Sequence, residues 1–84
     1  MKANVNESKY RSKDFWTCSV LLAAGVPLSG LERKSGSITT FVLDISPTEA
    51  EKTITRHFNN ELILPTKDLV EAVRTLKSRL HLGI

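Results

Sequence analysis

The sequence holds a single cysteine, Cys18, among its 84 residues, so no disulfide can form within the chain. Small secreted domains usually depend on disulfides, because their cores are too small to hold them folded. The lack of a second cysteine therefore favours an intracellular protein, and we expect it in the cytoplasm. Cys18 also stands far from both histidines and shows no zinc-type spacing, so neither a metal nor a cofactor is expected.

Aromatic residues are scarce, at 6% of the chain, and no apolar run is long enough to span a membrane. The longest run extends over residues 15–26, whereas a transmembrane helix needs about 20 apolar residues. Basic residues precede this run, as they do in a signal peptide. Asp14, Thr17 and Ser19 weaken that interpretation, and we favour a buried helix. A mainly aliphatic core and no membrane partner are therefore expected.

Length and composition indicate one small globular domain. The chain is 40% hydrophobic and 25% charged, which is ordinary for a folded protein. A domain of this size buries only about 60% of its unfolded surface, so its stability margin is small. Residues 1–10 are polar and without periodicity. They predict a mobile basic tail, followed by a single α+β domain over residues 11–84.

The first half of that domain predicts a helix followed by a β-hairpin. The helix is expected to begin with Ser12 as its N-cap and to end at Gly25, a residue suited to the left-handed conformation. Strands are expected over residues 26–33 and 38–45, joined by a short turn that contains a glycine. The second strand alternates clearly, and one of its faces collects Phe41, Leu43 and Ile45.

The second half predicts two further helices. Residues 46–49, Ser-Pro-Thr-Glu, form a capping box with proline at the first helical position. Asn59 and Asn60 are expected to end this helix. Residues 61–64 are expected to form a short extended piece, and whether it adds a third strand to the hairpin stays open; the last helix starts near Thr66. The predicted order is α-β-β-α-(β)-α, with helices packed on one face of the hairpin.

The apolar positions of these elements predict one shared core. They recur at helical spacing in the helices and at alternate positions in the strands. The predicted core consists of Phe15, Leu22, Leu31, Phe41, Leu43, Ile45, Ile54, Phe58, Leu69, Val73, Leu76 and Leu80.

No set of residues predicts catalysis, and we expect a protein that is not an enzyme. A catalytic thiol needs an exposed, electropositive setting, whereas Cys18 belongs to the apolar stripe of the first helix. Glu49 and Glu51 are two residues apart on a helix and therefore face different ways. The glycines match no phosphate-binding loop.

Basic residues gather toward both ends of the chain. Residues 1–13 hold four basic residues and one acid, and residues 66–84 hold four basic residues and two acids. Such ends attract phosphate, although they are also common as solubilising segments. Glu71 lies within reach of Lys67 and Arg74 on one helix and would mute their charge. The candidate nucleic-acid contacts are Arg33, Lys34, Lys67, Arg74 and Lys77.

Five short segments carry a resemblance to a known family. They are Asp14-Phe15, Gly25-Val26-Pro27-Leu28, Phe41-Val42-Leu43-Asp44, Phe58-Asn59-Asn60-Glu61 and Leu76-Lys77. Together they make residues 10–80 similar to a small domain-of-unknown-function family of bacteria, archaea and phages. The resemblance implies a prokaryotic or phage setting and a compact intracellular domain. It implies no catalytic residue, because that family has no established activity.

Two functions remain open at the level of sequence. The first is a non-enzymatic interaction module that associates with itself or with another protein. A short sheet has an unpaired edge, and Trp16 lies off the main apolar stripe of its helix, so either is a candidate interface. The alternative is weak, sequence-nonspecific binding of nucleic acid through the basic residues.

Overall fold

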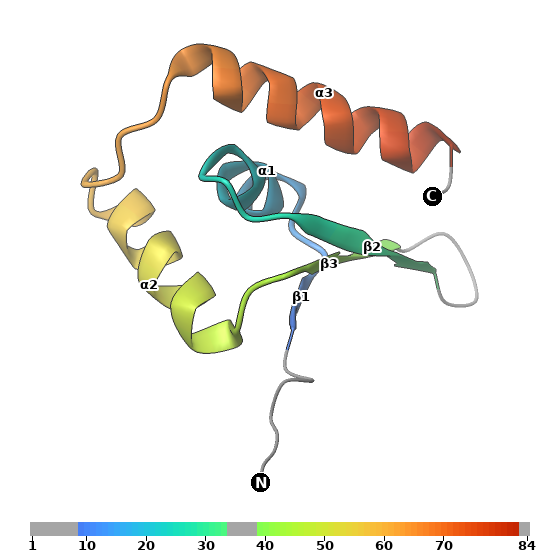
Figure 1. Ribbon diagram of the computed structural model, residues 1–84, viewed down its shortest axis with the longest axis horizontal. Helices are drawn as coiled ribbons and strands as arrows, with labels where there is room; N and C mark the ends of the chain where they lie inside the picture. Colours follow the sequence, from blue (N-terminus) through green and yellow to red (C-terminus); the bar gives the residue numbers. More distant parts are fainter. Residues whose placement is uncertain (1–8, 34–38, 83–84) are drawn as a thin grey trace, which may run out of the picture.

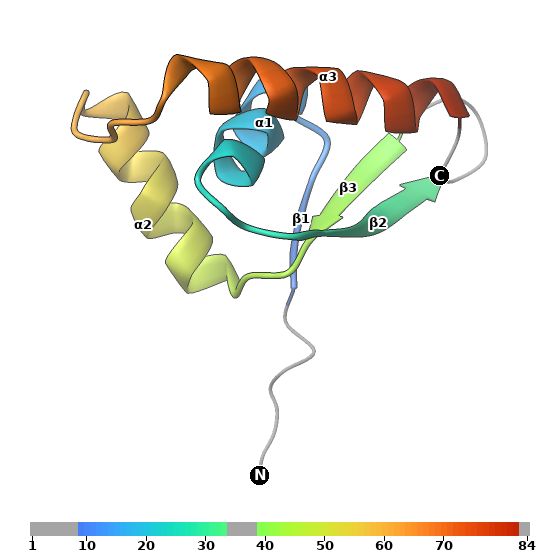
Figure 2. The ribbon, with the colours of Figure 1, turned by 45° about the horizontal axis from the view of Figure 1, so that its top comes forward.

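The computed structural model describes residues 9–33 and 39–82, and within these ranges it has the predicted α+β architecture. A three-stranded antiparallel sheet packs with three helices. Helix α1 lies between the sheet and α3, and α2 flanks α1 and β1 (Figures 1 and 2). The elements are β1 (Tyr10–Ser12), α1 (Phe15–Ala23), β2 (Leu28–Arg33), β3 (Thr39–Leu43), α2 (Pro47–Phe58) and α3 (Thr66–Leu82).

The sheet has the order β1-β3-β2, so the hairpin's second strand is central. Phe41 of β3 stands opposite Ser12 of β1 on one side and Leu31 of β2 on the other. Phe41 and Leu43 are buried beneath α1, as the alternation predicted. A β-bulge interrupts the regular register of β2 between Leu28 and Gly30.

The third strand comes from the N-terminal side of α1, not from residues 61–64. Those residues form no strand and connect α2 to α3, where Pro65 ends the extended segment. The strand β1 instead begins at Tyr10, the last residue of the predicted tail. Its sequence looks polar because Arg11 faces solvent while Tyr10 and Ser12 are half-buried. Tyr10 is therefore the only one of these three residues whose side chain type indicates a buried face.

The start of α1 also differs from the prediction. Ser12 is the last residue of β1 and not the N-cap; its hydroxyl accepts a hydrogen bond of 3.0 Å from the backbone N–H of Asp14. Asp14 is the N-cap, and its carboxylate accepts hydrogen bonds from the backbone N–H groups of Trp16 and Thr17. The chain therefore turns from strand to helix within two residues, and two side chains satisfy the exposed N–H groups.

The predicted ends of α1 and α2 are confirmed, and both helices end in the same way. Gly25 has φ of 103° and Asn60 has φ of 61°, the left-handed conformation that follows a helix. In α1, the N–H of Val26 reaches back to the carbonyl of Leu21. In α2, the N–H of Glu61 likewise donates a hydrogen bond to the carbonyl of Arg56. These are Schellman motifs, which satisfy the last carbonyls of each helix. The Ser46 N-cap and the first-position Pro47 of α2 are also confirmed.

The core is built around α1. Its residues Cys18, Ser19, Val20 and Leu21 are all buried, because α1 is apolar on every side and has neighbours on several. The predicted buried helix is thus confirmed. In the described part of the chain, no helix is long and apolar enough to cross a membrane. Most predicted core residues either are buried or pack against the core, and Cys18, Leu21 and Ala50 join them.

One predicted core residue is wrong. Phe58 continues the spacing of Ala50 and Ile54, but its side chain is 72% exposed. Ala50 is buried and Ile54 packs against the core, whereas Phe58 is the last residue of α2, one turn further on. There its ring contacts only His57 among the described aromatic rings, with centroids 5.1 Å apart. Periodicity marks the face of a helix, but it does not tell where along the helix the neighbouring element ends.

Candidate functional site

Cys18 lies in the core and is unsuited to nucleophilic chemistry. Its side chain has no exposed surface, and burial raises the pKa of the thiol to about 11. At neutral pH it is therefore almost wholly protonated, whereas a nucleophilic cysteine needs the thiolate. No group of three or more His, Cys, Asp or Glu residues in the described ranges is arranged to hold a metal ion.

Lys67 differs from the other described candidates for nucleic-acid contact because its charge is paired with a carboxylate. Lys67 lies in the first turns of α3 and donates a hydrogen bond to the carboxylate of Glu71. That hydrogen bond raises the pKa of Lys67 and lowers the pKa of Glu71. Both side chains are exposed, so the pair adds little stability, but it neutralises the lysine. Lys34 lies outside the described residues.

Arg33 is brought against the far end of α3. Its guanidinium donates a hydrogen bond of 3.0 Å to the backbone carbonyl of Leu80. Leu80 belongs to the last turns of α3, where carbonyl groups lack helical partners and the helix dipole is negative. The contact therefore joins the end of β2 to α3 and adds a positive charge at this end of the molecule.

Arg74 and Lys77 lie on the exposed face of α3 and make no hydrogen bond or ion pair within the described part of the chain. His81 follows four residues after Lys77, so the three side chains share one stripe of the helix. We call Arg74, Lys77 and His81 the α3 basic stripe. Both acidic residues of α3, Asp68 and Glu71, precede it, and none lies between Val73 and Leu82.

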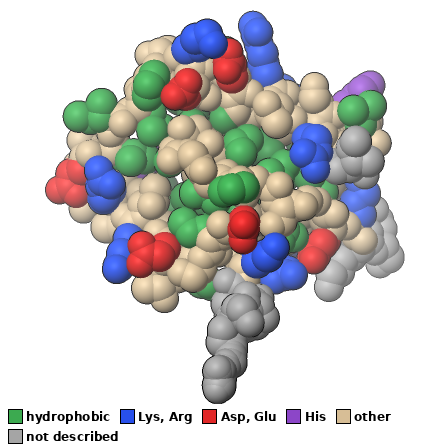
Figure 3. Space-filling model, in the orientation of Figure 1, with side chains coloured by type: hydrophobic (Ala, Val, Ile, Leu, Met, Phe, Trp, Pro, Cys, Tyr) green, Lys and Arg blue, Asp and Glu red, His purple; other side chains and the backbone are tan. Residues whose placement is uncertain are grey.

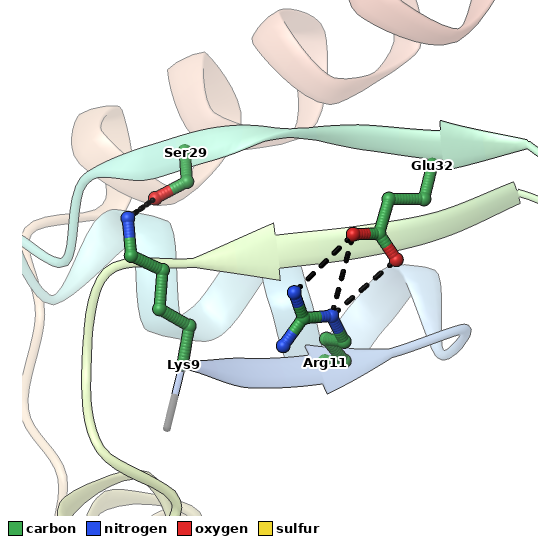
Figure 4. A network of polar contacts seen from close by, with 4 residues as sticks. All are labelled: Lys9, Arg11, Ser29 and Glu32. Atoms are coloured by element: carbon green, nitrogen blue, oxygen red, sulfur yellow. Dashed lines mark hydrogen bonds and ion pairs between the residues drawn. The ribbon is translucent and has the colours of Figure 1, made fainter. Parts of the chain in front are cut away.

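The face of the sheet turned away from α1 carries a charged network that the sequence did not reveal (Figure 4). Arg11 of β1 reaches across β3 and pairs with Glu32 of β2, with N–O distances of 3.3 to 3.4 Å. Lys9 donates to the hydroxyl of Ser29 at 3.0 Å and lies 3.9 Å from Asp44. The network was missed because it depends on β1, which the sequence did not predict.

This network rims a shallow hollow of about 420 Å³ over the middle of the sheet. Gly30 and Val42 lie within it, and a Cβ added to Gly30 would meet no atom within 4 Å. The cations Lys9 and Arg11 lie beside Asp44 and Glu32, and these acids offset their charge. We therefore assign no anion site to the hollow.

Trp16, the candidate interface residue, is exposed. Its side chain is 63% accessible, although it lies in a helix that is otherwise largely buried. The ring packs edge-on against Phe15, with centroids 5.1 Å apart, and Phe15 in turn contacts Phe41 of the core. Trp16 is thus held against the core on one side while most of its indole ring faces solvent.

Further large apolar side chains are exposed that were not expected to be exposed. They are Phe58, Ile63, Val70 and Leu82, with exposed fractions from 45% to 89%. Figure 3 shows hydrophobic side chains at the surface where α2 leads into α3, at the upper left. The apolar side chains of residues 61–64 favoured a strand at the level of sequence. The 89% exposure of Ile63 was therefore not expected.

Comparisons with known proteins add no relative. A scan against protein-family models, a search of curated proteins and a search of solved structures each gave no match.

Proposed function

We propose that this domain is a non-enzymatic interaction module that binds a protein partner, in the simplest case a second copy of itself, through the surface around Trp16. The observation that carries the proposal is the 63% exposure of this indole ring on an otherwise largely buried helix. Tryptophan is enriched at the energetically dominant positions of protein interfaces, because it buries a large apolar area on binding. We extend the proposal to a cytoplasmic setting in a prokaryote or phage, which the lone reduced cysteine and the family resemblance support.

The anchoring of Trp16 favours such a role. An exposed side chain that is mobile loses rotamer freedom on binding, which weakens the complex. The contact with Phe15 restricts the Trp16 ring before any partner arrives, so less freedom remains to be lost. Because Phe15 also contacts Phe41, the ring is fixed to the rigid core instead of to a loop.

The hairpin edge is the weaker of the two interfaces considered. The outer edge of β2 has backbone groups that no strand pairs in the described sheet. However, the bulge at Leu28 and Gly30 breaks the regular spacing that a partner strand would need. The opposite edge strand, β1, has three residues and so offers a partner strand few backbone groups to pair with. We therefore assign the interface to Trp16.

Sedimentation velocity over a range of concentrations tests this proposal. The wild-type chain is expected to pass from monomer to dimer, and Trp16→Ala is expected to remain monomeric. Phe58→Ala is the matched control, since it removes another exposed aromatic ring, on α2, and should leave the association unchanged. A wild-type chain that stays monomeric at the highest concentration contradicts self-association. Equal effects of both variants would indicate nonspecific hydrophobic association and not an interface at Trp16.

A further inference from the structure

We propose that the α3 basic stripe, together with Arg33, binds the phosphate backbone of double-stranded nucleic acid without reading its sequence. This activity is separate from the proposed protein interface, because Trp16 lies on α1. The inference rests on a juxtaposition that the fold creates. The Arg33–Leu80 hydrogen bond brings a cation from the end of β2 to the end of α3 where Lys77 and His81 lie.

Few acids lie near the charge at this end. Glu71 is the acidic residue nearest to Arg74 along α3 and attracts it, but its carboxylate accepts a hydrogen bond from Lys67 and forms no ion pair with Arg74. Glu32, next to Arg33 in sequence, pairs with Arg11 on the opposite face of the sheet. Arg74 and Lys77 are exposed and make no ion pair within the described ranges. Their charge is therefore directed toward solvent, where a polyanion attracts it.

A row of basic side chains on a rigid helix suits a regular row of phosphates. Arg74 and His81 are seven residues apart, so their Cα atoms lie about 10 Å apart along the helix. Contacts to phosphate alone position a protein on nucleic acid without specifying a sequence. Binding is therefore expected to be nonspecific.

The form of nucleic acid follows from the scarcity of aromatic side chains. Proteins that hold single strands stack the bases on aromatic rings. The stripe itself has no such ring apart from the imidazole of His81, and the exposed Trp16 and Phe58 belong to α1 and α2. A duplex presents its phosphates without requiring stacking, so we assign double-stranded nucleic acid.

An anionic membrane is the competing polyanionic surface, and the structure disfavours it. A helix that lies in a membrane surface buries an apolar face among the lipids. The apolar face of α3 is already used, since Ala72 and Leu76 are buried in the domain. Val70 and Leu82 are the large apolar side chains that α3 exposes, at 45% and 65%, and they lie beyond opposite ends of the stripe in sequence. Two such separated side chains do not make a continuous apolar face for insertion.

Fluorescence anisotropy with labelled duplex DNA and duplex RNA, titrated at several salt concentrations, tests the inference. The double variant Arg74→Gln/Lys77→Gln is compared with Lys52→Gln/Arg56→Gln. The control pair removes one lysine and one arginine from exposed positions of α2, so both variants have the same net charge. All four positions are on the surface, and both variants are expected to fold.

The wild-type chain is expected to bind duplexes of unrelated sequence with salt-dependent affinity. The α3 variant should lower the slope of log K against log salt by about 2 and weaken binding by about 10- to 100-fold at about 100 mM salt. The α2 control should keep the wild-type slope. Equal losses in both variants, tighter binding to single strands, or binding to anionic phosphatidylserine vesicles but not to duplexes would each overturn the assignment. So would the absence of duplex binding at low salt.

Discussion

The guanidinium of Arg33 donates a hydrogen bond of 3.0 Å to the carbonyl oxygen of Leu80, which lies 47 residues later in the chain. The contact links an edge strand to the last turns of the longest helix in the described structure. It places a cation at the negative end of the helix dipole and satisfies a carbonyl that has no helical partner. Arg33 therefore serves the fold as well as the charge of this end of the domain.

Arg33→Ala is expected to lower the free energy of unfolding by about 1 kcal/mol, because a hydrogen bond to a charged donor is lost at an exposed site. Amide hydrogen exchange in the last turns of α3 should become faster. Urea denaturation measures the first effect and exchange the second. Arg56→Ala is the control, since Arg56 is exposed on α2 and makes no side-chain ion pair in the described structure. Equal effects of the two substitutions would show that the contact to Leu80 does not stabilise the fold.

Two phenylalanines differ sharply in burial, one in the core and the other at the surface. Phe41 is 2% exposed at the centre of the sheet, whereas Phe58 is 72% exposed at the end of α2. Phe41→Ala should cost about 3–5 kcal/mol, enough to unfold much of a domain this small. Phe58→Ala should change stability by less than about 0.5 kcal/mol. Thermal melting followed by circular dichroism compares them, and similar melting temperatures would contradict the assigned core.

Much of the fold was predictable because local signals and the tertiary structure agree. The Ser46 cap, the glycine at position 25 and the shared inner face of Phe41 and Leu43 each depend on a few residues, and each is confirmed. Val42, on the other face of β3, is buried as well, which the alternation did not predict. The strand β1 was missed because three residues are too few for a pattern, and they become a strand only by pairing with β3. The exposure of Phe58 was missed because it depends on where its neighbours end.

The candidate site was predictable only as a set of residue types. The sequence correctly placed Lys67 and Glu71 within reach of each other, since helical spacing decides that contact. It could not show that Arg33 reaches the end of α3, because that contact depends on how β2 and α3 pack. The resemblance to an uncharacterised prokaryotic and phage family stays a prediction.

Asp14 is expected to stabilise the start of α1. Its carboxylate accepts a hydrogen bond of 2.7 Å from the Thr17 hydroxyl, which, with two backbone N–H donors, lowers the pKa of Asp14. Asp14→Ala should therefore cost about 1 kcal/mol at neutral pH, as for other N-caps. The ionised Asp14 stabilises the fold fully above the ordinary carboxyl pKa of 3.8, and this stability is lost as the pH falls through the lowered folded pKa.

Urea midpoints measured from pH 5 to about pH 2 check this pH dependence. Asp14→Asn is the control, because it does not titrate and retains an oxygen that accepts hydrogen bonds. The difference in stability between the wild type and this variant should shrink as the pH falls. A difference that stays constant over the whole range would contradict a lowered pKa at Asp14.

The buried thiol of Cys18 predicts a loss of stability at alkaline pH. Burial raises its pKa from the ordinary value of 9.0 to about 11, so the unfolded chain loses this proton first. The stabilising effect is complete below pH 9 and is lost as the pH rises from 9 to about 11. Over this range the loss amounts to about 3 kcal/mol.

Chemical denaturation between pH 8 and about pH 11 measures this loss. Cys18→Ala removes the thiol and should have a flatter pH dependence. Part of the slope should remain, because burial also raises the pKa of Tyr10. Identical slopes in the wild type and the variant would show that Cys18 does not titrate with unfolding.

The most direct test of the proposed function uses the emission of Trp16, the only tryptophan in the chain. Because its ring is 63% exposed in the isolated domain, emission should shift to the blue and acrylamide quenching should fall as protein concentration rises. Both changes should follow the same curve as the sedimentation coefficient. Emission and quenching that stay constant while the protein associates would place the interface elsewhere and contradict the account.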